Sequence, residues 1–441
     1  MHRLDRAFPE FGWRRDAHGW VATNEEHTHS RLGVRAERVV AHGPAPRGFL
    51  VHGGEPMLWT AYVNGGAVPR GVGFVRVVRE IAERAGVDTA PLDRPQPRDR
   101  RSDLLHDFFE LCRRELSGEH GAAARAYLER RGFPEEAIAA SGLGVVPPSA
   151  ETSRLLESKG YRPKEIASAS VLADSRWPGR LCGAWRTEHG RIGTLWARSL
   201  DDDMAPNARY LYLRGASRTN LPPYGLHDVL AETSAARHEL ILVEGFLDLH
   251  QLRAQAVVNV AALGGTSIRP RMFERLHRLG VETVTLCLDN DDAGRAAAAR
   301  AVEHSARANS SPQVFVVDPK RLSPSKDPDD FVRARGSEAW RELIASRDCG
   351  IAWRAQELVI EVAPESPAAE RRTALARAGR WLGTLPPRLA LEQEEAVRLI
   401  AEECGYSAEA VARSFRARFW RPPESSLRPP RLRIEAHVLE R

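Results

Sequence analysis

The sequence predicts a multidomain α+β protein, in which an α/β domain with a parallel sheet follows a mixed α/β subdomain and precedes a small helical domain. Four short apolar runs within residues 239–335 alternate with amphipathic helical stretches, which is typical of a parallel sheet. Residues 103–235 combine helical patterns with short strands and turns. After Trp340 the pattern stays helical to about Phe419.

The first predicted domain covers residues 1–90, and it is rich in β structure. Short apolar runs broken by Gly and Pro indicate strands at Arg47–Val51, Met57–Val63 and Gly73–Val75. A helix over Phe74–Ala85 ends the domain. Residues 91–102 are rich in proline and charge, so we interpret them as a linker.

The second predicted domain covers residues 103–235. Its first part is helical from Asp103 to about Ala140, because the apolar residues recur on one face. Gly179–Trp185 and Arg191–Trp196 are predicted to pair as a hairpin across Glu188–Gly190.

The parallel sheet is predicted within residues 236–345, followed by a helical domain at 346–420 and a basic, proline-rich tail at 421–441. The helical stretches that separate its strands include Met272–Leu279 and Ala293–Ala306. The four strand-like runs are Leu240–Val243, Val257–Ala261, Val281–Leu288 and Val314–Val317.

Composition excludes several classes of protein. The five cysteines are widely separated and form no CxxC, which argues against a disulfide framework and a thiolate zinc site. None of the four lysines follows a glycine, so the phosphate loop of ATP-driven motors is absent. The uncharged stretch Ala254–Ile268 is shorter than the ~18 residues of a membrane span. We therefore expect a cytoplasmic protein without a membrane partner.

Acidic residues follow two of the predicted strands directly. Glu244 directly follows Leu240–Val243. Asp289 directly follows Val281–Leu288, and Asp291 stands two residues further on. The carboxyl ends of parallel strands meet at one edge of a sheet, where ligands bind. Each acid alone is more simply explained as a helix cap or a solvated turn. Together, their oxygen-only side chains predict a site for Mg²⁺ or Mn²⁺.

A third acidic segment, Lys326–Asp330, contains Asp327 and Asp329. With VEGFLD at 243–248, LDNDDAGRAAA at 288–298 and KDPDDF at 326–331, the chain resembles a TOPRIM domain over roughly residues 239–335. Bacterial-type primases, topoisomerases and several nucleases share that domain. The order of the three motifs agrees with the strand pattern.

Segments upstream of these motifs resemble the core of the DnaG-type bacterial primases, an RNA polymerase-like core with a TOPRIM domain. They include Ala124–Gly132, Asn207–Leu211 and Tyr224–Leu226. TOPRIM topoisomerases and nucleases lack this half, so the resemblance extends over about residues 103–420.

The resemblance implies a DNA primase that joins nucleoside triphosphates into short RNA primers on single-stranded DNA. It implies that Asp289, Asp291 and Asp327 bind Mg²⁺ or Mn²⁺ with Asp329 in support, and that Glu244 binds metal or acts as a base. Asp248 is expected to orient its neighbours. Template and triphosphate are expected to contact four upstream arginines, Arg180, Arg191, Arg198 and Arg209.

Residues 1–90 depart from the family, whose N-terminal zinc ribbon carries Cys and His ligands. No cysteine is present there, so we expect a degenerate ribbon-like domain without structural zinc. A helicase-docking domain would have little room after Phe419, and a helicase or a protein of the same operon is a candidate partner. Two alternatives are a TOPRIM metal-dependent nuclease, and a catalytically weak nucleic-acid-binding adaptor of a mobile element or defence system.

Overall fold

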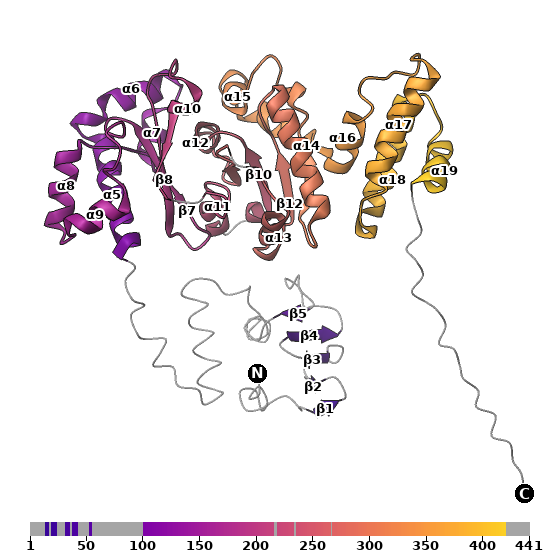
Figure 1. Cartoon of the computed structure of the whole chain (residues 1–441), viewed down its shortest axis with the longest axis horizontal. Helices are drawn as coiled ribbons and strands as arrows, with labels where there is room; N and C mark the ends of the chain where they lie inside the picture. The colour runs from indigo at the N-terminus through magenta and orange to yellow at the C-terminus, as the bar shows by residue number, and fades with distance from the viewer. Residues whose placement is uncertain are drawn as a thin grey trace, which may run out of the picture. The chain divides into compact units, whose positions relative to one another are not determined.

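The computed structural model describes residues 100–215, 218–232, 235–265 and 267–419, together with five short strands within residues 14–54 (Figure 1). The chain divides into two compact units, Met1–Asp99 and Arg100–Arg441. The division falls within the segment predicted as a linker. The predicted helix Phe74–Ala85, the three predicted N-terminal strands and the basic tail lie outside the described residues.

The first unit contains a five-stranded antiparallel sheet in the order β1-β2-β3-β4-β5. The β-rich character was predicted, but these strands were not, because charged residues interrupt their apolar pattern. Their bounds are Arg14–Asp16, Gly19–Thr23, Arg31–Arg35, Arg38–His42 and Gly53–Gly54.

The second unit begins with a helical segment packed on a four-stranded antiparallel sheet of order β6-β7-β8-β9. Helix α5 (Arg100–Ser117) buries the predicted apolar face, including Leu104 and Phe108. The predicted hairpin is confirmed as β7 (Leu181–Arg186) and β8 (Ile192–Arg198). The other elements are α6 (Ala122–Arg130), α7 (Glu135–Ala140), β6 (Gly144–Val145), α8 (Ser149–Ser158), α9 (Pro163–Ala169), α10 (Pro206–Arg209), β9 (Tyr210–Tyr212) and α11 (Leu226–Ala231).

A second sheet follows in the order β11-β10-β12-β13-β14, and its first four strands are parallel as predicted. The fifth strand, β14, is antiparallel to β13 and was not predicted, because two residues are too short to show a pattern. The strands are β10 (Glu239–Val243), β11 (Val260–Ala262), β12 (Thr283–Leu286), β13 (Gln313–Val316) and β14 (Asp348–Cys349).

Helices cover both faces of the parallel sheet, and Figure 1 shows α12 and α14 on opposite sides of β10 and β12. Alternate residues of a strand point to opposite faces, so Leu240 and Leu242 join one core while Ile241 and Val243 join the other. The connecting helices are α12 (Phe246–Ala254), α13 (Pro270–Arg278), α14 (Asp292–Arg307) and α15 (Pro328–Ala345).

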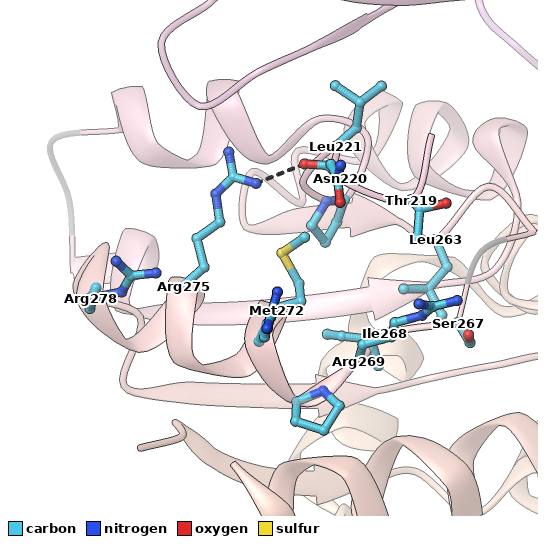
Figure 2. A pocket seen from close by; sticks show the side chains of 13 residues that line it. Thr219, Asn220, Leu221, Leu263, Ser267, Ile268, Arg269, Met272, Arg275 and Arg278 are labelled. Carbon is cyan, nitrogen blue, oxygen red and sulfur yellow. Dashed lines mark hydrogen bonds between the residues drawn. The ribbon is translucent and has the colours of Figure 1, made fainter. Parts of the chain in front are cut away.

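A cavity of about 740 Å³ lies beside α13 (Figure 2). Its other wall is formed by the segment that leads into Tyr224, including Asn220 and Leu221. Arg275 donates a hydrogen bond of 2.9 Å to the Asn220 carbonyl oxygen and so ties the two walls together.

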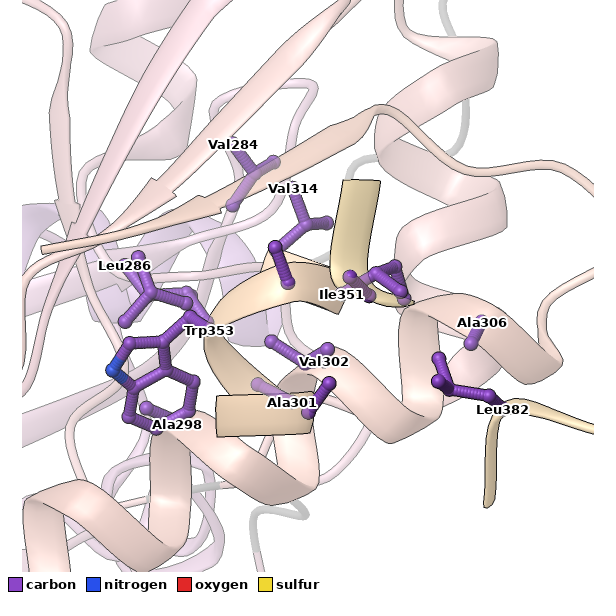
Figure 3. Close-up of a cluster of buried hydrophobic side chains, with 14 of the residues drawn as sticks. Val284, Leu286, Ala298, Ala301, Val302, Ala306, Val314, Ile351, Trp353 and Leu382 are labelled. Carbon is purple, nitrogen blue, oxygen red and sulfur yellow. The ribbon is translucent and has the colours of Figure 1, made fainter. Parts of the chain in front are cut away.

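The C-terminal helices share a core with the parallel sheet (Figure 3). Val284 and Val314 of the sheet, Val302 of α14, Ile351 of α16 and Leu382 of α17 belong to one buried cluster. These helices are α16 (Gly350–Glu357), α17 (Ala368–Leu382), α18 (Ala390–Glu403) and α19 (Ala408–Arg418).

No helix among the described residues is long and apolar enough to cross a membrane.

Candidate metal and nucleotide site

The strand ends bring two acidic segments to one edge of the parallel sheet. β10 and β12 are adjacent, with Leu242 opposite Leu286, so Glu244 and Asp289 leave the sheet side by side. Asp291 is the N-cap of α14, and its Oδ1 accepts a hydrogen bond of 2.7 Å from the Gly294 amide. Burial, and then the negative charge of Asp291, raise the pKa of Glu244.

Asp289 is the most strongly perturbed acid at this edge. Burial, followed by repulsion from Asp248 and Glu244, raises its pKa to about 8. Its Oδ1 is buried and accepts no hydrogen bond from the described residues. Gly294 allows α14 to start this close, because a Cβ there would lie 2.2 Å from the Asp289 carbonyl oxygen.

The third acidic segment is bound directly to the second. The Asn290 backbone amide donates a hydrogen bond of 2.8 Å to the Lys326 carbonyl oxygen. The Asn290 side-chain Nδ2 donates a second hydrogen bond, of 3.1 Å, to the Ser325 carbonyl oxygen. Asp327 then caps α15, because its Oδ1 accepts a hydrogen bond of 2.7 Å from the Asp330 amide. These backbone contacts hold Asp289 and Asp327 at neighbouring points of the edge.

Asp248 joins this acidic cluster. One carboxylate oxygen from each of Asp248, Asp327 and Asp329 lies within 4.8 Å of the other two. Burial, then the charges of Asp327 and Asp329, raise the pKa of Asp248 to about 7. From the sequence we expected Asp248 only to orient its neighbours. Its position one helical turn after Glu244 was the available signal.

Asp329 differs from the other acids because two arginines neutralise it. Its side chain is fully buried, and it accepts hydrogen bonds of 2.6 Å from Arg131 Nη2 and 2.7 Å from Arg333 Nε. Arg131 belongs to the Ala124–Gly132 segment but was not singled out from the sequence. It links the upstream subdomain to the acidic cluster across 198 residues of sequence.

Two of the four upstream arginines are engaged within the protein. Arg198 is 7% exposed and donates hydrogen bonds of 2.9 Å to the hydroxyl groups of Tyr127 and Tyr210. Arg180 is 8% exposed and donates to the carbonyl oxygens of Ala208 and Arg209, both at 3.0 Å. Their guanidinium groups therefore hold the upstream sheet and its loops together.

The other two arginines are more accessible. Arg191 is exposed, and no hydrogen bond or ion pair joins its side chain to the described residues. Arg209 is half-buried, and its Nη2 donates a hydrogen bond of 3.0 Å to the Asp202 carbonyl oxygen. These two side chains are the better placed to meet a ligand.

The aromatic residues of the upstream sheet pack against α12. Phe246 stacks on Trp196 with ring centroids 4.7 Å apart, and Trp185, Tyr210 and Tyr224 meet it edge to face. Trp185 and Trp196 are fully buried, so these two rings pack in the core and are not exposed for stacking on bases. The contact fixes the upstream sheet beside the helix that carries Asp248.

His250 is also buried. It is 5% exposed, and its Nε2 lies 3.0 Å from the Tyr224 hydroxyl. Burial, then the charge of Arg253, lower its pKa to about 3, so it is a neutral core residue at pH 7. Cys182 and Cys287 are buried as well.

The donor set of the cluster fits a divalent cation. All of its donors are oxygens, which suit hard cations such as Mg²⁺ and Mn²⁺. Burial, and after it repulsion between neighbouring carboxylates, raises the pKa values of Glu244, Asp248, Asp289 and Asp327, and a bound cation would offset that repulsion. The unpartnered Oδ1 of Asp289 is a free donor atom within the group.

Comparisons with known proteins agree with this geometry. Residues 241–332 match the family described as Toprim-like. The DNA primase of Pseudomonas aeruginosa is 30% identical over 322 residues, which cover 66% of this chain and 46% of that protein. A primase domain structure from P. aeruginosa shares 27% identity and a TM-score of 0.56, over 71% of this chain and 98% of that chain.

A second solved structure is similar: the RNA polymerase domain of the Mycobacterium tuberculosis primase DnaG, in complex with a double-stranded DNA oligomer with a 6-nucleotide overhang. It shares 25% identity and a TM-score of 0.57, over 70% of this chain and 98% of that chain. The present chain spans about half the length of the curated relatives it matches. The chain is a relative of the DnaG-type primases, with a TOPRIM domain inside a primase-type catalytic core.

Proposed function

We propose that this chain is a metal-dependent DNA primase that makes short RNA primers on single-stranded DNA. The observation that carries the proposal is the acidic edge of Glu244, Asp289, Asp291 and Asp327, which lies inside a primase-type core. Similarity to primases that include a DNA-bound domain supports it. Nucleoside triphosphates are the second substrate.

The acids divide into ligands and supports. Asp289, Asp291 and Asp327 are the proposed ligands of Mg²⁺ or Mn²⁺, because they crowd one edge and Asp289 has an unpartnered oxygen. Two bound cations would activate the attacking 3′ oxygen and offset the charge that develops on the leaving pyrophosphate. Asp329 supports the site from behind, because both of its oxygens accept from arginines.

Glu244 is the proposed base toward the 3′ hydroxyl group. Burial and Asp291 raise its pKa, so its carboxylate is a better proton acceptor than an exposed glutamate. Because it stands at the end of β10 beside Asp289, it can also bind metal. In either role the carboxylate must be unprotonated at the moment of reaction.

The phosphates of template and triphosphate are proposed to meet Arg191 and Arg209, whose side chains are the more accessible of the four arginines. Guanidinium groups bind phosphate in a fork geometry. Arg180 and Arg198 shape the surface from within, because their donors are used by carbonyl and hydroxyl oxygens. A helicase or an operon-encoded protein is the proposed partner.

The test is incorporation of labelled nucleotides on single-stranded DNA with Mg²⁺ or Mn²⁺, run beside a nicking assay on supercoiled DNA. Asp289→Asn should abolish incorporation, because it replaces a ligand by a neutral isostere. Asp292→Asn is the matched control: Asp292 is the next acid in the same segment, and it is exposed. Metal-dependent nicking without incorporation would assign a nuclease instead, and full activity of Asp289→Asn would overturn the site.

A further inference from the structure

The cavity beside α13 has a positive rim and an apolar floor. Four arginines line it, Arg269, Arg271, Arg275 and Arg278, and none of the described lining residues is acidic. Its apolar lining includes Leu221, Leu263, Ile268 and Met272. Its volume of about 740 Å³ falls within the roughly 300–1,000 Å³ of small-ligand pockets.

The side chains of two of these arginines make no hydrogen bond or ion pair with the described residues. These two are Arg269 and Arg271, and both are exposed. Arg275 is different, because it forms an ion pair with Glu188 and also donates to the Asn220 carbonyl oxygen. Arg275 therefore links the two walls of the cavity, while Arg269 and Arg271 remain available to an anion.

Glu274 is the acid on α13 that could compete for these arginines. Its carboxylate instead accepts hydrogen bonds from the Asn309 amide at 3.0 Å and the Asn309 side chain at 2.8 Å, on the connection that follows α14. It does not line the cavity. Hydrogen bonding from Asn309, and to a smaller extent the charges of Arg278 and Arg271, lower the pKa of Glu274, so this acid offsets part of the positive charge of α13 without forming an ion pair.

The cavity adjoins the acidic edge. The Leu263 amide donates a hydrogen bond of 2.9 Å to the Val243 carbonyl oxygen, and the Gly264 amide donates one of 2.9 Å to that of Glu244. Gly264 and Gly265 both have positive φ, of 60° and 72°, and this turn leads the chain from β11 toward α13. A strand with one phosphate at Glu244 would thus have its neighbouring nucleotides beside Leu263.

We propose that this cavity binds one or two nucleotides of a single nucleic-acid strand that crosses the acidic edge. Arg269 and Arg271 contact its phosphates, and a base rests on Met272 and Leu263, which Figure 2 shows at the cavity between α13 and the segment of Leu221. Charge complementarity favours a strand, because the acidic edge repels a polyanion and this cavity attracts one. The inference rests on the proposed function, since it supplies a strand path to that site.

The experiment measures binding of the full chain to fluorescent oligothymidylate and oligouridylate by anisotropy, at salt concentrations from about 50 to 200 mM. Each phosphate contact contributes about 0.7 to the logarithmic salt slope on single strands, which is a factor of about 5 in affinity at 0.1 M salt. Arg269→Gln with Arg271→Gln should reduce the slope by about 1.4 and the affinity by about 25-fold.

The matched control removes two charges elsewhere. Arg341→Gln with Arg413→Gln changes exposed arginines of α15 and α19 that pair with Glu338 and Glu409 on their own helices. It should leave the slope within measurement error. Arg269→Lys with Arg271→Lys should keep most of the salt slope of the unmodified chain, because the two positive charges remain. Met272→Gln should lower the affinity and leave the salt slope unchanged.

Three outcomes decide the proposal. A loss on either oligonucleotide that exceeds the loss in the control supports a strand site, and the more affected one identifies DNA or RNA as its occupant. Equal losses in both double variants overturn it. Inorganic triphosphate is also tested as a competitor of the oligonucleotides. If the Arg269 and Arg271 variant loses only the competition by inorganic triphosphate and keeps its oligonucleotide affinity, the proposal is overturned, because the cavity would then bind a free nucleotide. Primer synthesis by the unmodified chain is scored separately, so strand binding without synthesis refutes the proposed function alone.

Discussion

Replacing Asp289 by Asn should stabilise the metal-free protein at alkaline pH. Burial, and then repulsion from Asp248 and Glu244, raises the pKa of Asp289 from 3.8 to about 8 in the folded chain. Each unit corresponds to about 1.4 kcal/mol, so ionising this carboxyl group costs the fold up to about 5 kcal/mol. The amide of Asn carries no charge and avoids that cost.

The sign of the pH dependence follows from proton binding. Between pH 4 and pH 8 the folded state holds a proton on Asp289 that the unfolded state has lost, so the free energy of unfolding falls as pH rises. The stability is fully present below the unfolded pKa and is lost as pH rises through the folded one. Asp248, whose pKa is raised to about 7, adds a loss of the same sign.

The assay is urea unfolding of the chelator-treated protein at about pH 5 and pH 9, with and without Mg²⁺. The unmodified chain should lose stability between the two values and regain it on adding Mg²⁺, because an ion that binds only the folded state stabilises it. Asp289→Asn should lose less and respond weakly to Mg²⁺, while Asp292→Asn should behave like the unmodified chain. Equal losses and equal Mg²⁺ responses in all three proteins would refute this account of the cluster.

Three further predictions concern the supports of the site. Arg131→Met should destabilise the second unit by about 3 kcal/mol in urea unfolding, because it leaves the buried Asp329 with a single arginine. The control variant Arg130→Met replaces an exposed arginine and should change the stability little. Equal effects of the two variants would contradict the prediction. Gly294→Ala should weaken Mg²⁺ binding in calorimetry about as much as Asp289→Asn, since its Cβ would displace the Asp289 backbone; unchanged affinity would contradict this. Phe246→Ala should lower the free energy of unfolding by about 3–5 kcal/mol, and Phe246→Leu should lower it less, because the Phe246 ring is the centre of the aromatic cluster. A small effect of Phe246→Ala would show that the subdomains pack independently of this ring.

The sequence was sufficient for the elements with strong local patterns. Apolar runs such as Leu240–Val243 and Val281–Leu288 have the length and composition of buried strands, and the helices between them bury one face. Glu244 and Asp289 could be placed at one edge because the carboxyl ends of parallel strands coincide. The short strands β5 and β14 could not be predicted, because pairing with a neighbouring strand defines them.

The functions of individual arginines depended on contacts far apart in sequence. Arg180, Arg191, Arg198 and Arg209 look alike in an arginine-rich chain, yet two of them are buried and donate to groups inside the protein. Arg131 gave no local sign of its contact with Asp329, because that ion pair joins two subdomains.

The sequence by itself determined the fold class, the parallel strand pattern and the acidic character of the edge, since these follow from local periodicity and from where each acid stands relative to a strand. Only the tertiary structure decided which acids form one cluster, that Asp248 belongs to it, and that Asp329 is neutralised. Burial and repulsion set the pKa of Asp289, and both depend on neighbours that folding brings together from three separate segments.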